Sequence, residues 1–347
     1  MRQIRTALLS YGMSGQVFHA PFLELHPGFE LAGSWERNKA TISQDYPNAK
    51  TYPTLEDVLR DESVELVIVN TPTVTHFEYA KAALLAGKHV IVEKAFTTNA
   101  AEAKLLHEIA ESENVVLSVY QNRRWDSDFR TVQSVLEKNL IGEIVEAELH
   151  FDRYNPNLSP KTHKETRNAG AGIVKDLGAH IIDQALVLFG FPQKLFADIR
   201  TTRTNSVVDD WFDITLYYES TRVRLKGSYF VREALPSYVF HGKIGSFIKS
   251  RGDIQEQELK LGKKPVLLDW GKEPEIRQGV LHTEIEGEIV HEHIPTLPGN
   301  YYYYFDELYH AIENGGKVPV HALEGYNTMR IIDAAFRSSE RGELVIF

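Results

Sequence analysis

A lysine at the end of an apolar segment is the residue of this chain best placed to do chemistry. Lys94 follows Glu93, and both come directly after the mostly apolar segment 88–92. A buried strand of an open α/β sheet delivers the residues at its carboxyl end to the crevice where ligands bind. The Lys94 ammonium could there hydrogen-bond a substrate oxygen and stabilise charge that develops on it. The alternative is a surface ion pair between Glu93 and Lys94.

A second group combines a histidine with two carboxylates. Asp176, His180 and Asp183 occupy positions i, i+4 and i+7 of an expected helix, and these positions share one face. Because the pKa of histidine lies near neutrality, His180 could take the proton of a hydroxyl group, while a neighbouring carboxylate orients its ring. The alternative is that Asp176 only caps the helix and His180 is a core residue.

A glycine-containing turn near the N-terminus is typical of a dinucleotide site. The segment 10–15 matches the pattern G-x-G-x-x-G, except that Ser10 replaces the first glycine. Gly12 lets the backbone approach a pyrophosphate, and Gly15 lets the following helix pack closely on the strand. The start of that helix presents free N–H groups to phosphate oxygens. We therefore expect cofactor contacts from five residues, although a plain turn would look similar: Ser10, Gly12, Met13, Ser14 and Gly15.

Two residues about 20 positions beyond this turn give conflicting signals on the cofactor. An acidic residue such as Glu36 would bind the 2′-hydroxyl of the adenosine ribose and favour NAD. Arg37 follows directly and would accept the 2′-phosphate of NADP instead. Both residues could also belong to a solvated turn.

Further candidates lie at the ends of later elements. Thr71 and Pro72 follow an expected strand and would lie beside the cofactor, or they would only mark a helix start. His76 could contact the cofactor or lie on the surface.

Polar residues between the two halves of the chain complete the candidate set. Gln121 and Asn122 could hydrogen-bond the cofactor or the substrate. Arg124 could bind substrate or brace two domains, and Arg153 and Tyr154 could line a pocket for a polyol. No set of metal ligands stands out, so we expect no metal.

Strand and helix patterns alternate over the first 120 residues, which predicts a parallel sheet covered on both faces. Thr54 with Asp57 and Asn99 with Glu102 are typical of helix starts. The expected strands are 4–9, 29–34, 66–70, 90–92 and 115–120, and the expected helices are 55–60, 76–86 and 99–113.

The pattern changes after this block. Strands then follow one another with few helices between them, which predicts an antiparallel sheet in an α+β domain. The expected strands are 144–151, 195–201, 211–218 and 223–230, and the expected helices are 128–140, 177–189, 302–313 and 322–339. The charged segment 250–264 is interpreted as a surface excursion. We expect a dinucleotide-binding domain over residues 1–122 and a substrate-binding domain over residues 123–347.

Composition excludes several classes of protein. The 347 residues are 43% hydrophobic and carry a net charge of −10, without a basic stripe, which argues against nucleic acid or an anionic membrane as partner. The absence of cysteine excludes disulfides, thiol catalysis and thiolate-bound zinc. No apolar run approaches the roughly 18 residues of a membrane span. We expect a cytoplasmic protein.

The motifs together resemble the Gfo/Idh/MocA oxidoreductase family, and the likeness covers essentially the whole chain. It rests on the turn at 10–15, Thr71-Pro72, Glu93-Lys94-Ala95 and the segment 176–183. The segments 11–21, 121–129 and 241–249 look most like the inositol-dehydrogenase-like branch, in particular NADP-dependent enzymes of scyllo-inositol. One departure is Ala95, because the family usually has proline there.

The resemblance implies a Rossmann domain and then an α/β domain with a large open, mainly antiparallel sheet. It also implies that this second domain serves in oligomerisation, as a homodimer or homotetramer. It implies Lys94, Asp176 and His180 as the catalytic set, with hydride transfer between NADP, or NAD, and a secondary hydroxyl of a cyclitol or sugar. Two alternatives remain: cleavage of glycosides with transient use of bound NAD, and a nucleotide sensor without catalysis.

Overall fold

Contacts within the chain divide it into two units, each built around its own sheet. The computed structural model describes residues 1–36 and 40–347. The first unit contains residues 1–122, 255–270 and 300–326, and the second contains residues 123–254, 271–299 and 327–347. The segments 255–270 and 300–326 thus group with the N-terminal sheet, whereas the sequence had assigned them to the second domain.

The first unit has a six-stranded parallel sheet with helices on both faces, as predicted. Its strand order is β3-β2-β1-β4-β5-β6, and the order reverses between β1 and β4, where a doubly wound sheet opens its ligand crevice. Every residue of β4 and β6 is buried. The strands are β1 (Ile4–Leu8), β2 (Phe29–Trp35), β3 (Lys50–Tyr52), β4 (Leu66–Val69), β5 (His89–Glu93) and β6 (Leu117–Tyr120).

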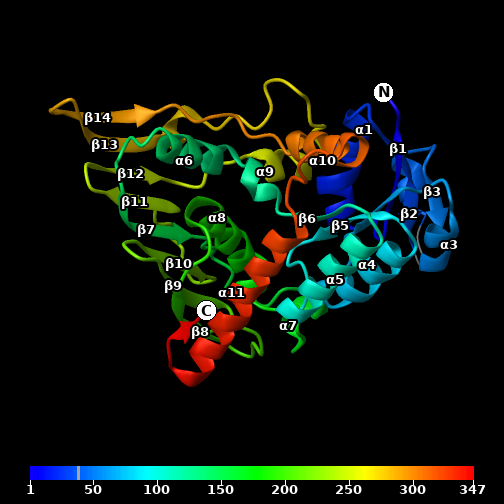
Figure 1. The fold of residues 1–347 in the computed structure, drawn as a ribbon, viewed down its shortest axis with the longest axis horizontal. Coiled ribbons are helices and arrows are strands. Elements are labelled where there is room, and N and C mark those ends of the chain that lie inside the picture. The colour runs from blue at the N-terminus through cyan, green and yellow to red at the C-terminus, as the bar shows by residue number, and fades with distance from the viewer. Residues whose placement is uncertain (37–39) are drawn as a thin grey trace. The chain divides into compact units, whose positions relative to one another are not determined.

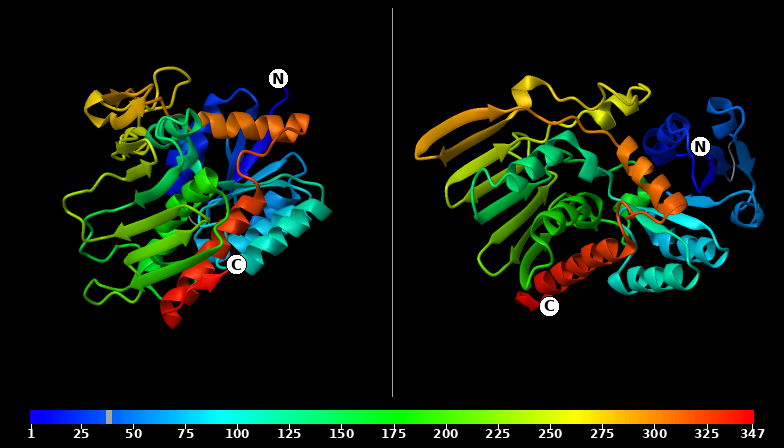
Figure 2. Two further views of the ribbon diagram at one scale, coloured as in Figure 1. Left: turned by 60° about the vertical axis from the view of Figure 1, so that its left-hand side comes forward. Right: turned by 45° about the horizontal axis from the view of Figure 1, so that its top comes forward.

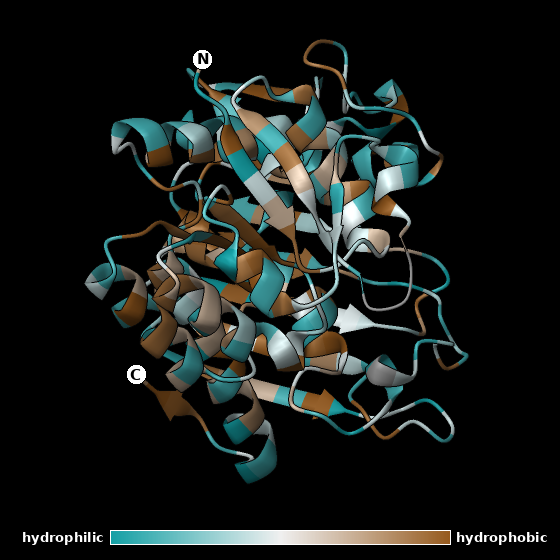
Figure 3. Cartoon of the chain, turned by 90° about the vertical axis from the view of Figure 1, so that its right-hand side faces the viewer, coloured by the Kyte–Doolittle hydropathy of each residue, from teal (hydrophilic) through white to brown (hydrophobic). Residues whose placement is uncertain are grey.

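Helices α4 and α5 cover one face of this sheet, and α1 and α10 cover the other (Figures 1 and 2). The helices of the first unit are α1 (Ala20–Leu25), α2 (Ile42–Asp45), α3 (Leu55–Arg60), α4 (His76–Leu85), α5 (Ala100–Ser112), α9 (Gln255–Lys260) and α10 (Tyr302–Asn314), with short turns η1 (Gly15–His19) and η2 (Thr73–Thr75). Hydrophobic residues gather on the central strands and hydrophilic ones on outer turns and loops (Figure 3).

The predicted helix starts are confirmed. Thr54 accepts a hydrogen bond from the Asp57 backbone, and the Asp57 carboxylate accepts one from the Thr54 backbone, which completes a capping box. The Asn99 side chain accepts a hydrogen bond from the Glu102 backbone. Such caps satisfy N–H groups that the first helical turn leaves without partners.

The segment interpreted as a surface excursion is partly buried, so that prediction was wrong. Residues Gln255 and Leu259 of α9 are buried, and the Gln255 side chain accepts a hydrogen bond from the Tyr301 backbone at 2.8 Å. The many charged residues of this segment suggested exposure and gave no sign that Gln255 and Leu259 are buried. Tyr301 and Tyr304 are likewise fully buried.

The second unit has a nine-stranded mixed sheet that is mostly antiparallel. Its order is β14-β13-β12-β11-β7-β10-β9-β8-β15, and only β7 and β10 pair in parallel. The strands are β7 (Ile144–His150), β8 (Lys194–Arg200), β9 (Trp211–Tyr217), β10 (Arg222–Ser228), β11 (Tyr238–Gly242), β12 (Gly245–Lys249), β13 (Gly279–Ile285), β14 (Glu288–Ile294) and β15 (Val345–Ile346).

Helices α6 and α8 pack on one face of this sheet and leave the other uncovered (Figure 1). On β9 the buried Phe212, Ile214 and Leu216 alternate with partly exposed residues, as expected for a sheet with one solvated face. The helical segments that contain residues of the second unit are α6 (Ser127–Glu137), α7 (Thr162–Glu165), α8 (Ala179–Phe189) and α11 (Ala322–Arg341), with turns η3 (Asn122–Trp125), η4 (Val174–Gly178) and η5 (Glu275–Arg277). None of the described helices is long and apolar enough to cross a membrane.

Candidate active site

The glycine turn closes tightly against the ends of β1 and β4. A side chain at Gly15 would place its Cβ 2.5 Å from the Ser10 carbonyl oxygen, so only glycine fits there. The Ser10 hydroxyl accepts a hydrogen bond from the Gly12 backbone at 3.2 Å. Asn70, the residue after β4, donates its side-chain amide to the Ser10 carbonyl at 2.7 Å. The turn is therefore fixed to the strand at the crevice.

Glu93 fixes the same turn from the end of β5. Its Oε1 accepts hydrogen bonds from the Ser14 hydroxyl at 2.6 Å and lies 2.9 Å from Nε2 of His19, which is buried in η1. Burial alone would raise the pKa of Glu93. Three neighbours outweigh this effect of burial and lower the pKa of Glu93. They are His19, through its hydrogen bond and its charge, the Ser14 hydroxyl, and the charge of Lys94. Glu93 is thus a carboxylate that braces the glycine turn, and His19 is a partner that sequence analysis missed.

Lys94 lies at the carboxyl end of β5, directly after this brace. Its backbone N–H donates to Glu93 Oε2 at 3.2 Å, and its side chain is partly exposed. The peptide bond between Lys94 and Ala95 is cis. Ala95 and Phe96, which follow, are buried.

His76 joins the residues after β4 to those after β5. Its Nε2 lies 2.8 Å from the Thr71 carbonyl oxygen, and its Nδ1 lies 2.9 Å from the Ala95 carbonyl oxygen. The ring is buried, and this burial lowers the pKa of His76. Thr71 also shares a hydrogen bond with Thr75 at 2.7 Å. These hydrogen bonds therefore hold the segment from Thr71 to His76 against the residues that follow Lys94.

Two buried acceptors at this edge of the sheet have no hydrogen-bond partner in the part of the chain that the structure describes. They are Asn70 Oδ1, after β4, and Gln121 Oε1, after β6. A buried acceptor without a donor is costly, so a ligand with hydroxyl or amide donors would stabilise both. Asn122, next in the chain, is also buried. These groups fit the ribose hydroxyls and carboxamide of a nicotinamide dinucleotide.

Glu36 does not present a spare carboxylate. Its Oε2 accepts hydrogen bonds from the backbone and hydroxyl of Thr41, at 3.0 and 2.5 Å, and its Oε1 accepts one from the Ile42 backbone at 3.0 Å. Glu36 therefore caps the start of α2. Arg37 lies outside the described residues.

In the second unit, the segment with the candidate histidine begins earlier than predicted. A π-turn, η4, precedes α8, so Asp176 lies within helical backbone rather than at its cap. Asp176 accepts a hydrogen bond from the Lys164 ammonium at 2.8 Å. His180 is buried, and its ring lies 6.0 Å from that of Phe151.

Asp183, on the same helix, pairs with Arg124 through both carboxylate oxygens. The Arg124 Nε and Nη2 atoms donate to them at 2.8 and 2.7 Å. Such a two-pronged pair fixes the orientation of both groups. Arg124 is thereby aligned on the helix that holds His180.

Asp209 supports the start of η4 and was missed by sequence analysis. Its carboxylate accepts a hydrogen bond from the Val174 backbone at 2.9 Å, and its carbonyl accepts one from Ile173 at 2.9 Å. The Asp209 carboxylate fills the space that a side chain at Gly172 would need, since a Cβ there would lie 1.9 Å from Oδ1. Burial raises the pKa of Asp209 to about 6.

Three guanidinium groups surround the ring of Phe151, which neighbours His180. Arg123, Arg153 and Arg251 lie 5.1, 5.5 and 4.1 Å from its centroid. Tyr154 is 41% exposed, and the guanidinium of Arg232 lies over its ring, 3.9 Å from the ring centroid. The second unit thus gathers three arginines around Phe151, the aromatic ring that neighbours His180.

Each unit therefore groups its own share of the candidate residues. The first unit places the turn at 10–15, Thr71, Pro72, His76, Glu93, Lys94 and Gln121 at the carboxyl edge of one sheet. The second unit places Asp176 and His180 on successive turns, with Arg124 aligned by Asp183.

Two family models match the chain in succession. Residues 4–121 match "Oxidoreductase family, NAD-binding Rossmann fold", and residues 133–346 match "Oxidoreductase family, C-terminal alpha/beta domain". Both models describe the Gfo/Idh/MocA group.

Individual relatives extend over nearly the whole length. The scyllo-inositol 2-dehydrogenase (NADP(+)) IolW of Bacillus subtilis is 36% identical over 343 residues, which cover 99% of this chain and 96% of the relative. The uncharacterised oxidoreductase YdgJ of Escherichia coli is 37% identical over 338 residues, which cover 97% of this chain and 96% of YdgJ.

Solved structures give the same result. The structure named as the oxidoreductase yvaA of Bacillus subtilis superposes with a TM-score of 0.95 at 36% identity and covers 99% of this chain and 98% of its own. An oxidoreductase structure from Bacteroides fragilis superposes with a TM-score of 0.91 at 40% identity, with both chains fully covered. With its parallel Rossmann sheet, its open mixed sheet and both family models matched, the chain belongs to the Gfo/Idh/MocA family of oxidoreductases.

Proposed function

We propose that this oxidoreductase transfers hydride between a nicotinamide cofactor and a secondary hydroxyl of a cyclitol or sugar, with scyllo-inositol as the best candidate. The observation that carries the proposal is the position of Lys94 at the end of β5. There it follows Glu93, the carboxylate that braces the glycine turn at 10–15. The similarity to IolW, named as a scyllo-inositol 2-dehydrogenase, supports the choice of substrate.

In this proposal, separate groups of residues bind the cofactor and act on the alcohol. Ser10, Gly12, Met13, Ser14 and Gly15 would hold the pyrophosphate, while Thr71, Pro72, Gln121 and Asn122 would contact the nicotinamide half. When bound, the cofactor supplies the hydride acceptor. His180 takes the hydroxyl proton, and Lys94 holds the reacting oxygen and stabilises its charge.

Asp176 orients the substrate or His180, and Arg124, Arg153 and Tyr154 line the substrate pocket in this proposal. The roles of Lys94 and His180 can also be exchanged. Both groups can hydrogen-bond an alcohol oxygen, and either could accept its proton.

We propose NADP as the preferred cofactor. The Glu36 carboxylate already accepts three hydrogen bonds from Thr41 and Ile42, which leaves it poorly suited to bind a ribose hydroxyl. Arg37, next in sequence, has the charge to accept a 2′-phosphate. The name of IolW specifies NADP(+), which agrees with this preference.

The test follows nicotinamide absorbance with scyllo-inositol, myo-inositol and a panel of aldoses, with NADP and NAD in parallel. Turnover of scyllo-inositol with NADP supports the full proposal. Turnover of an aldose alone keeps the dehydrogenase and changes the substrate. Release of sugar from a glycoside without net cofactor reduction, or cofactor binding without turnover, would overturn it in favour of a glycoside-cleaving enzyme or a sensor.

We also propose that the chain assembles into a homodimer or homotetramer, with the open face of the nine-stranded sheet as the interface between subunits. This face carries exposed Phe196 and partly exposed Trp211 and Tyr217 among charged side chains. Light scattering that shows a monomer at working concentration would reject this assembly.

A further inference from the structure

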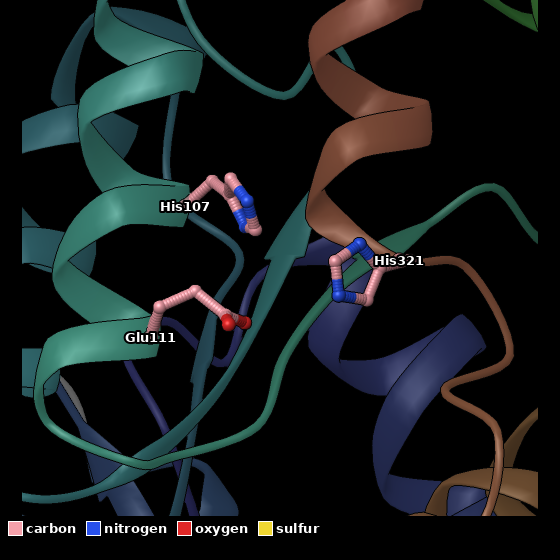
Figure 4. A group of neighbouring side chains, drawn as sticks. All are labelled: His107, Glu111 and His321. Carbon is pink, nitrogen blue, oxygen red and sulfur yellow. The ribbon is translucent and has the colours of Figure 1, made fainter.

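Two histidines and a glutamate converge on the first unit, apart from every residue assigned above. His107 and Glu111 belong to α5, and His321 directly precedes α11. One potential ligand atom from each residue lies within 4.8 Å of the others. All three side chains point toward a common space between the two segments (Figure 4).

The backbone holds these three residues in place. His107 and Glu111 are four positions apart on one helix, so their side chains share a face. Val320, which precedes His321, accepts hydrogen bonds from the Val119 backbone at 3.1 Å and from the Ser118 hydroxyl at 3.0 Å. The third residue is thereby attached to β6. A site built on a helix and an extended sheet is more rigid than one on loops.

The donor atoms suit a divalent transition metal. Two imidazole nitrogens and one carboxylate are a common set for zinc, with further positions left to water. In the described part of the chain, no hydrogen bond or ion pair occupies the side chains of His107 or Glu111. The rings of His107 and His321 lie with centroids 5.3 Å apart, edge to face.

His321 has one ring nitrogen to offer. Its Nδ1 accepts a hydrogen bond from the Leu323 backbone at 3.2 Å, and its backbone N–H donates to Glu324 at 2.8 Å, so it caps α11. The remaining nitrogen is Nε2. Binding of a metal there moves the ring proton to Nδ1 and gives up the long contact with Leu323.

We propose that His107, Glu111 and His321 bind a divalent cation of the zinc type. The cation joins α5 to the first turn of α11. Gly325, on that turn, packs closely on Phe96, since a Cβ at Gly325 would lie 2.9 Å from the Phe96 ring. Bound metal therefore reinforces the packing of α11 on the segment that follows Lys94. This inference is independent of the proposed reaction.

The test is calorimetric titration of the metal-free full chain with zinc chloride at pH 7.5, where imidazole is mostly neutral. Loss even of a group that only supports a ligand weakens metal binding about 10- to 100-fold, so His107→Gln and His321→Asn should each weaken zinc binding at least tenfold. Asparagine at 321 keeps a capping acceptor, which protects the fold. Zinc should raise the Tm of the wild type more than that of either variant.

Matched controls identify the site. Glu108→Gln removes another exposed carboxylate from α5 and should leave zinc binding unchanged. His291→Gln tests a competing pair, because His282 and His291 face each other across β13 and β14 with centroids 5.0 Å apart. If His107→Gln and His321→Asn bind zinc as the wild type does, or if binding is lost only in His291→Gln, the proposal is overturned.

Discussion

The Ser14 hydroxyl donates a hydrogen bond of 2.6 Å to Glu93, which precedes the candidate catalytic Lys94. Ser14 belongs to the glycine turn that is proposed to hold the cofactor. One carboxylate therefore joins this turn to the residue that would act on the substrate. A substitution of Glu93 should therefore affect both cofactor binding and the position of Lys94. This coupling gives the first prediction.

Glu93→Gln should weaken cofactor binding and lower turnover. Hydrogen bonds to charged groups contribute about 1.5–3 kcal/mol, so the KM for the cofactor should rise about ten- to a hundredfold. Steady-state kinetics with the cofactor varied measure the effect. Glu113→Gln, an exposed change after α5, is the control. An unchanged KM would show that the brace does not shape the glycine turn.

Lys94→Ala and His180→Ala should each lower kcat about 10²- to 10⁴-fold, the usual effect of a general acid, base or oxyanion partner. Cofactor binding, measured by fluorescence, should persist in His180→Ala. If both variants kept near-wild-type turnover, the catalytic assignment would be wrong. Circular dichroism of each variant serves as the folding control.

Glu36→Ala and Arg37→Ala should separate structure from cofactor choice. Loss of a cap costs about 1 kcal/mol, so Glu36→Ala should lower stability. It should leave the ratio of kcat/KM for NADP and NAD nearly unchanged, because Glu36 is occupied by Thr41 and Ile42. Arg37→Ala should reduce kcat/KM for NADP selectively. A selective loss of NAD activity in Glu36→Ala would instead identify Glu36 as the ribose acceptor.

Asp209 should make stability depend on pH. Its folded pKa of about 6 lies above the usual 3.8, so the folded state binds more protons than the unfolded state between these values. Stability should therefore fall as pH rises from 3.8 to about 6, by at most about 3 kcal/mol at 1.36 kcal/mol per pKa unit. Urea unfolding of the wild type and Asp209→Asn across this range tests the effect. Equal slopes for the two proteins would exclude Asp209 as its source.

Sequence patterns predicted the first unit better than the second. Strands such as β4, buried on both faces, read as apolar runs, and the caps at Thr54 and Asn99 are local signals. β11 to β14 escaped prediction, and β14 shows why: most of its residues are exposed, so no alternation of apolar residues marks it.

The same division holds for the candidate site. Lys94 and His180 are marked by residue type and position along the chain. Asn70 and Asp209 act through residues 60 and 35 positions away, so their contacts appear only once the chain is folded. The last polar residue of an apolar strand was the one available signal for Asn70.

The π-turns η1 and η4 each contain a candidate residue, Gly15 in η1 and Asp176 in η4, and such turns are frequent at functional sites. A π-turn holds one residue more than regular helix would, and each residue of an α-helix rotates the chain by about 100°. Deletion of one residue from 175–178 would let the helix wind regularly and would bring Val174, whose backbone donates to Asp209, one position closer to His180 along the chain. Length, as much as residue identity, is therefore under constraint in this segment.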